Sequence, residues 1–288
     1  MTTTKGFIIS DITGRYNLLL KDSDYTTIKN SKTFEDITIR LNHYFPFITE
    51  NITMSELKQI FIINLKREIN EFSKYNLTIL NYFTDYYKII SLFNKINKIK
   101  INELGEFPEL KAIELCNNFK EIKAVCINNS SLQKYFVDLD GNETNMFLEV
   151  MKNLMNNYYE SSEGYFKEIL EVEGDRQILE IALSNLQDKS KYFPNCTTLN
   201  KLQLTELSKN LSKEEVVQIF NLSNDNFMNE ILTKIVNVYK NSFNQFDDLS
   251  CIYAYFKLKE IQIGNIIWII QCKNNNMEDK QNEIIKIN

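Results

Sequence analysis

The chain has 288 residues, of which 43% are hydrophobic and 25% charged, and its formal net charge is −5 at pH 7. This composition excludes a wholly disordered chain and allows one large domain or two ordinary ones. The mild acidity argues against a general binder of nucleic acid or of anionic lipid, because both kinds of binding depend on a basic surface.

The sequence carries no sign of secretion or of a membrane span. Its N-terminus lacks the charged start, apolar centre and small-residue cleavage site of a signal peptide. The only long apolar run, near residues 261–270, is too short and too interrupted to cross a bilayer. Five cysteines without a Cys-x-x-Cys pair agree with a reducing compartment, so we expect a cytosolic protein whose thiols are buried.

Residues that break helices are scarce. Only seven glycines and three prolines occur, which favours long helices joined by short connections. The predicted fold class is therefore all-α. The spacing of apolar residues predicts helices near residues 53–72, 77–97, 107–126, 143–160, 163–187, 200–222, 226–243 and 248–273.

The N-terminal part holds the one histidine of the chain, His43, in Leu-Asn-His-Tyr-Phe-Pro. A site with several histidine ligands is therefore impossible, and a Ser/His/Asp triad would have to use this residue. Its place before Phe45-Pro46 favours a turn or packing role. Neither G-x-x-x-x-G-K-[ST] nor G-x-G-x-x-G is present, so we predict no ATP site, no cofactor and no metal.

A degenerate internal repeat is the next feature along the chain. Asp85, Asp175 and Gln262 each precede an apolar run, and they lie about 90 residues apart, as expected of repeated units. A shorter motif recurs at residues 34–37 and 119–122 and, less clearly, at 213–216. We predict three pseudo-repeated helical units in a single domain. They cover approximately residues 1–100, 101–190 and 191–288.

Charged residues fall on the apolar stripe of the helix predicted at 163–187. Asp175 and Arg176 lie on this stripe, and an unpaired buried charge is too costly to persist. An alternative is that Glu171, Glu173 and Asp175 hold a divalent cation or perform acid/base chemistry. Such a site would make the protein a carboxylate-dependent hydrolase. Helix geometry weakens this hypothesis, because residues two apart point to different sides of a helix.

The helix predicted at 248–273 also carries a charged residue on its apolar stripe. Lys259 falls on its apolar stripe, which runs from Ile252 to Ile270. Two interpretations of Asp175, Arg176 and Lys259 stay open: an interhelical ion-pair cluster between the second and third units, or contact with a partner protein. Trp268 is open in the same way, as a packing residue or as an interface anchor.

Three ordered landmarks together resemble the subunit d family of vacuolar-type proton ATPases. They are Glu-x-Glu-x-Asp-Arg at 171–176, the Phe-Pro turn within 191–199, and Lys-x-Lys-Glu followed by Asn-Ile-x-Trp-Ile at 257–269. The resemblance points to structural or interface roles for Glu173, Asp175, Arg176, Lys259, Glu260, Asn265 and Trp268. The family usually has Glu and Arg where this chain has Gln262 and Gly264.

The resemblance implies a function as well as a fold. Members of this family, like their prokaryotic relatives in rotary ATPases, are three-part helical funnels without catalytic activity. They link the membrane proteolipid ring to the central stalk and so couple ATP hydrolysis to proton transport. The implied partners are the proteolipid c-ring, the D and F subunits of the central stalk, and the a subunit of the membrane sector.

The implied location is the cytosolic face of vacuolar or other endomembranes, with membrane contact only through the ring. A different class of function also stays open on the sequence. A helical-repeat scaffold or adaptor, without any pump association, would bind peptides in a concave groove. Such a protein would purify away from membranes.

Overall fold

The computed structural model describes residues 2–48, 52–75, 77–97, 107–129, 131–137, 139, 145–245 and 248–287. Within these ranges every regular element is a helix and no strand occurs, which confirms the predicted all-α class. The chain forms two compact units, one made of Met1–Leu80 with Leu232–Asn288 and the other of Asn81–Ile231. It passes from one unit to the other within α5 (Thr78–Ile96) and again within α12 (Phe227–Ser242).

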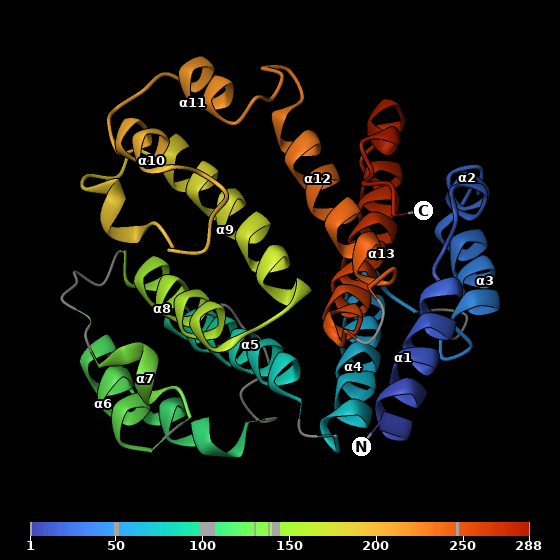
Figure 1. The fold of residues 1–288 in the computed structure, drawn as a ribbon. Coiled ribbons are helices and arrows are strands. Elements are labelled where there is room, and N and C mark those ends of the chain that lie inside the picture. Colours follow the sequence, from blue (N-terminus) through green and yellow to red (C-terminus); the bar gives the residue numbers. More distant parts are fainter. Residues whose placement is uncertain are drawn as a thin grey trace. The chain divides into compact units, whose positions relative to one another are not determined.

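The first unit is built around its last long helix. It contains α1 (Thr2–Asn17), α2 (Asp22–Lys29), α3 (Phe34–Tyr44), α4 (Met54–Ser73), most of α12, α13 (Ser250–Asn274) and the short 3₁₀ helix η5 (Glu278–Asn282). Figure 1 shows α13, in orange to red, with the α1 and α4 helices that it contacts. It also contacts α2 and η5. Helix α13 is therefore the centre of this unit.

The sequence predicted an amphipathic stripe on α13, and the structure buries more of the helix than that. The six consecutive residues Cys251–Phe256 are all buried, which no single face of a helix could achieve. Neighbours on several sides account for this, since α1, α2 and α4 pack on α13 and Tyr239 of α12 lies edge-on to Tyr253. This first part of α13 is covered all round and behaves as a core element.

The second unit contains the remaining helices. They are most of α5, η2 (Pro108–Leu115), α6 (Phe119–Asn129), α7 (Gln133–Phe136), α8 (Met146–Ser161), α9 (Tyr165–Leu183), η4 (Lys189–Tyr192), α10 (Lys201–Leu207) and α11 (Lys213–Ile219). Helix α8 packs against α7 and α9, and α9 packs against α11. The aromatic rings of Tyr82, Tyr158 and Phe166 meet edge to face in the core between α5, α8 and α9.

Most of the predicted helices are observed, as α4, α5, α8, α9, α12 and α13. Two predicted helices are each split in two, η2 with α6 and α10 with α11. The cause lies in residues that cap a new helix: Asn118 and Ser212 accept hydrogen bonds from the backbone N–H of Glu121 and Glu215. Such side chains start a helix and so interrupt a longer one.

The short repeated motif has a common local structure. Phe34, Phe119 and Lys213 are the first residues of α3, α6 and α11, and each helix start carries a side-chain cap. The fourth residue of each motif is buried, namely Ile37, Ile122 and Val216. The motif therefore describes a capped helix start that places an apolar residue in the core. The division into three repeated units stays a prediction.

Candidate functional site

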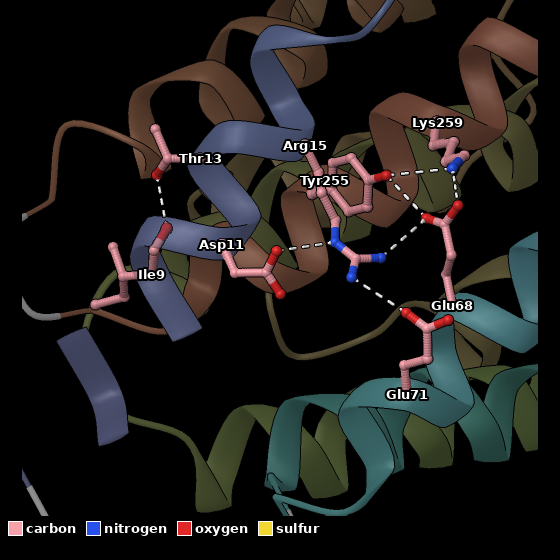
Figure 2. Close-up of polar contacts among 8 residues, drawn as sticks. All are labelled: Ile9, Asp11, Thr13, Arg15, Glu68, Glu71, Tyr255 and Lys259. Atoms are coloured by element: carbon pink, nitrogen blue, oxygen red, sulfur yellow. Dashed lines mark hydrogen bonds and ion pairs between the residues drawn. The ribbon is translucent and has the colours of Figure 1, made fainter. Parts of the chain in front are cut away.

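A cluster of charged side chains joins α1, α4 and α13 in the first unit (Figure 2). Lys259 of α13 forms an ion pair with Glu68 of α4. The Tyr255 hydroxyl, one turn before Lys259, donates to the other oxygen of the same carboxylate at 2.8 Å. Arg15 of α1 lies between carboxylates, with its guanidinium 3.1 Å from Asp11 and 3.1 Å from Glu71. Three helices are thus joined through one set of charges.

Burial shapes the electrostatics of this cluster. The side chains of Lys259 and Glu68 are only 12% and 18% exposed. Burial lowers the pKa of Lys259, and the charge and hydrogen bond of Glu68 act against that change. Burial also raises the pKa of Tyr255, with the Glu68 charge adding to the effect, so this hydroxyl stays protonated and donates. Lys259 therefore depends on Glu68 to remain charged at low cost.

Asp175 lies in the second unit, on the side of α9 that faces the segment after η4. Its carboxylate is buried and accepts hydrogen bonds from the Thr197 hydroxyl, the Thr198 hydroxyl and, at 3.0 Å, the Thr198 backbone N–H. Burial raises the pKa of Asp175, while the threonine hydrogen bonds oppose that rise. The predicted buried carboxylate is present, and its partners are threonines.

The segment from Lys189 to Leu199, here named the return loop, lies directly on α9. A Cβ atom on Gly174 would lie 1.8 Å from the carbonyl oxygen of Cys196, so only glycine permits this approach. On α8, Glu149 lies 2.7 Å from the Lys191 ammonium and Asn156 accepts from the Asn195 N–H at 2.7 Å. The return loop is therefore fixed to both helices.

Of the two interpretations of Asp175, Arg176 and Lys259, the interhelical ion-pair cluster is wrong in its partners, and contact with a partner protein stays a prediction. Asp175 is bound by threonines, and Lys259 pairs with Glu68 within its own unit. Arg176 is exposed and pairs with Glu180 one turn along α9, at 3.0 Å. A helix turns through about 100° per residue, so Arg176 points away from the surface that buries its neighbour.

The other residues singled out by the sequence lie on the same two helices. Glu173 is half-buried on α9, and Glu260 pairs with Lys257 on α13 at 2.8 Å. The Trp268 indole N–H donates to the Lys280 carbonyl at 3.1 Å. Trp268 is thus half-buried against the chain's own C-terminal segment.

Asn265 is buried and binds that segment more closely. Its Nδ2 donates to the Ile285 carbonyl at 2.7 Å, and its Oδ1 accepts from the Ile285 N–H at 3.0 Å. One amide side chain therefore pairs with both polar groups of one backbone residue. The role of Asn265 inside the folded chain is to hold the tail on α13.

The three reference positions of the predicted repeat, Asp85, Asp175 and Gln262, share one feature. Asp85 accepts from the hydroxyls of Tyr135 at 2.8 Å and Tyr158 at 3.1 Å, and Gln262 accepts from the Leu20 N–H at 2.6 Å. Like Asp175, both are buried. Each is an acceptor that fixes another segment to its helix, so these charged or polar residues stabilise packing.

Sequence reasoning missed Glu68, Arg15 and the partners of Asp85. A signal for Glu68 was present, since it lies three residues after Leu65 and four before Phe72, both of them buried core positions. This spacing places it beside the apolar stripe of α4. The same reasoning that identified Lys259 would have identified its partner.

The residues weighed for catalysis do not converge. Glu171 accepts from the Tyr159 hydroxyl at 2.7 Å, whereas Asp175 is bound by the return loop. His43 is exposed, with its ring edge-on to Tyr44. No group of three metal-ligating side chains is found among the described residues. Nor is any described helix sufficiently long and apolar to pass through a membrane.

Comparison with known proteins bears on the sequence as a whole. A family model described as ATP synthase (C/AC39) subunit matches residues 8–284. The chain belongs to this ATP synthase (C/AC39) subunit family. The match extends over both compact units.

Individual proteins that are similar to this chain carry the name of V-type proton ATPase subunit d. The chain is 22% identical to "V-type proton ATPase subunit d" of Saccharomyces cerevisiae, over 98% of this chain and 97% of that protein. It is 25% identical to the protein of the same name from Dictyostelium discoideum, over 65% of this chain and 62% of that protein. "Probable V-type proton ATPase subunit d 2" of Drosophila melanogaster is 22% identical over 99% of this chain and 97% of the relative.

Proposed function

We propose that this chain is a non-catalytic subunit of a rotary vacuolar-type proton ATPase. In this role it links the membrane proteolipid ring to the central stalk and so couples ATP hydrolysis to proton transport. The observation that carries the proposal is the family match over residues 8–284, together with relatives named V-type proton ATPase subunit d that align along nearly the whole chain.

The internal contacts of each unit suit mechanical work. The Lys259–Glu68 pair fastens α13 to α4, and the Asp175–Thr198 contact fastens the return loop to α9. Polar anchors of this kind, inside closely packed helices, resist deformation and transmit strain. A protein that passes torque between a rotor ring and a stalk needs that stiffness in each part of its body.

The partners in this proposal are the proteolipid c-ring on one side, the D and F subunits of the central stalk on the other, and the a subunit of the membrane sector nearby. The protein would lie on the cytosolic face of vacuolar or other endomembranes. Contact with the membrane would be indirect, through the ring. The net charge of −5 fits this arrangement, because a protein that turns close to anionic lipid gains nothing from a basic surface.

The non-catalytic part of the proposal rests on how the carboxylates are used. Glu171 and Asp175 each bind a different partner within the chain, a tyrosine hydroxyl and two threonines. Groups committed to fixing other segments are poorly placed to share an ion or a proton with a substrate. ATP hydrolysis would then belong to other subunits of the complex.

The test is to solubilise native membranes with a mild detergent, capture this chain by an affinity tag, and identify the co-purifying proteins by quantitative mass spectrometry. We expect the proteolipid and the a, D and F subunits in near-stoichiometric amounts. A parallel capture from the membrane-free supernatant is the control. Recovery of a lone protein from both fractions would overturn the proposal and favour a scaffold.

A further inference from the structure

The last residues of the chain fold back along α13. After η5, the tail from Glu283 to Ile287 has no helical structure of its own. Two features hold it on the helix, namely the paired hydrogen bonds between Asn265 and Ile285 and the fully buried side chain of Ile287. The tail is therefore seated like a bound peptide, by one backbone residue and one aliphatic side chain.

The same tail runs alongside α2 in the opposite direction. Asn282 accepts from the Lys29 ammonium at 3.1 Å, at the last residue of α2. The Lys286 ammonium lies 3.8 Å from Asp22, at the first residue of α2. The tail contacts the start of this helix through Lys286, and the residue just before the tail, Asn282, contacts its end. Figure 1 shows the C-terminus beside α13, on the side toward α2.

Helix α13 also holds the α2 region directly. Gln262 accepts from the Leu20 N–H just before α2, and the Lys273 ammonium donates to the Ser31 carbonyl just after it, at 2.7 Å. Between them the Asn265 Nδ2, which donates to Ile285, also lies 3.4 Å from the Tyr25 hydroxyl oxygen. Asn265 is thus a side chain of α13 that contacts both the tail and α2.

We propose that residues 283–287 are a releasable strap. The strap occupies a site on α13 that recognises an extended aliphatic peptide through the Asn265 amide, and its seating fastens α2. A segment without helical structure, held mainly by one amide side chain and one buried aliphatic side chain, belongs to the part of a protein that opens locally. Lifting it leaves the buried Asn265 amide without its two shortest hydrogen bonds, so the vacated site favours rebinding of the same kind of peptide.

The first test uses the full chain with Ile285→Pro. This change removes the backbone N–H that donates to Asn265 and alters no residue of a helix. Ile285→Val keeps that N–H and is the matched control. Hydrogen exchange followed by mass spectrometry should show α2 amides exchanging roughly tenfold faster in Ile285→Pro, as expected for losing one buried hydrogen bond. Exchange in α2 of Ile285→Val, and in α4 of both variants, should match the wild type.

The second test asks whether the vacated site binds a peptide. A fluorescent peptide with the sequence of residues 283–288 should bind the full-length Ile285→Pro protein at least tenfold more tightly than the wild type, whose site is filled by its own strap. The same peptide carrying Ile287→Asp should not bind, because Ile287 is fully buried in the folded chain and a carboxylate there would lose its water.

The proposal is overturned if α2 exchanges at the wild-type rate in Ile285→Pro, or if α4 accelerates together with α2, which would mean general loosening. It is also overturned if the peptide binds both proteins equally or binds neither. None of these outcomes depends on membership of a proton pump. Failure of the strap proposal would therefore leave the proposed function standing.

Discussion

Lys259 and Glu68 lie 191 residues apart in sequence and form an ion pair in the first unit. Tyr255 donates to the same carboxylate, so a single glutamate of α4 satisfies two side chains of the central helix. Removing one partner of a buried pair leaves the other charge uncompensated, and that penalty exceeds the net gain of forming the pair. The effects of substitution should therefore be large and specific to this glutamate.

Glu68→Gln should destabilise the protein by about 2–3 kcal/mol, because Lys259 would stay buried without the carboxylate that it pairs with. Urea unfolding at neutral pH measures this. Glu71→Gln is the matched control: its side chain is 45% exposed and also contacts Arg15, so its loss should cost no more than about 0.5 kcal/mol. Equal effects of the two substitutions would contradict the assigned role of Glu68.

Asp175→Asn should loosen the return loop, since an amide offers one acceptor oxygen in place of the carboxylate that receives three hydrogen bonds. We expect a loss of about 1–3 kcal/mol in the free energy of unfolding. Arg176→Ala, next to it but exposed, should change stability by no more than about 0.5 kcal/mol. Thermal unfolding of both variants separates a buried anchor from a surface charge.

The effect of Asp175→Asn on the free energy of unfolding should depend on pH, in a direction set by the pKa of Asp175. Burial raises the folded-state pKa of Asp175 above its unfolded value, so the folded protein binds this proton more tightly. The group's contribution to stability is then greatest below the unfolded pKa and decreases as pH rises through the folded pKa. The advantage of wild type over Asp175→Asn should therefore shrink as pH rises above about 4. Denaturant titrations at several pH values measure this difference in stability. If the difference grows as pH rises above about 4, the raised pKa assigned to Asp175 is wrong.

Two helical glycines should respond in opposite ways to alanine. Gly174→Ala places a methyl group against the Cys196 carbonyl and should cost several kcal/mol or displace the return loop. Gly264→Ala on α13 meets no atom within 4 Å and should stabilise the protein by about 0.5–1 kcal/mol, because alanine favours the helix. Calorimetric melting temperatures report both. A loss of stability in Gly264→Ala would contradict the open space that the structure shows around this glycine.

Gln262→Glu should destabilise the first unit at neutral pH by about 1–3 kcal/mol, since the buried side chain has one described donor, the Leu20 N–H. Asp85 and Asp175 have carboxyl side chains at the corresponding positions of the predicted repeat, where each receives at least two hydrogen bonds. The uncharged Gln262 side chain therefore suits a buried position at which one donor, the Leu20 N–H, is described. Unfolding at pH 4 and pH 7 should show the variant recovering as its carboxyl group is protonated.

Much of this fold could be predicted from the sequence. The scarcity of glycine and proline indicated an all-α chain, and apolar spacing located the long helices from α4 onward. Helices α1 to α3 were not predicted. Helix α1 contains Gly6, Gly14 and several β-branched residues, which give a weak helical signal, so its packing against α13 has to supply the stability.

The candidate site was predictable only in part, for a physical reason. Periodicity shows that Asp175 and Lys259 lie on buried faces, and both do. It carries no information on which element covers those faces, so the partners were wrongly predicted. The covering element is the return loop in one case and α4 in the other. Arg176 was misplaced because the buried face of α9 takes in Gly174 and Asp175 and ends before Arg176, which is exposed.

The two units should fold at different stages of synthesis, because only the second is made of one continuous segment. The second unit, Asn81–Ile231, is continuous and can fold as soon as it leaves the ribosome. The first unit cannot, because α13, around which α1, α2 and α4 pack, follows these three helices in the chain and is synthesised long after them. Until then the apolar faces of these three helices lack their shared partner. Nascent chains should therefore depend on chaperones mainly through their first 80 residues.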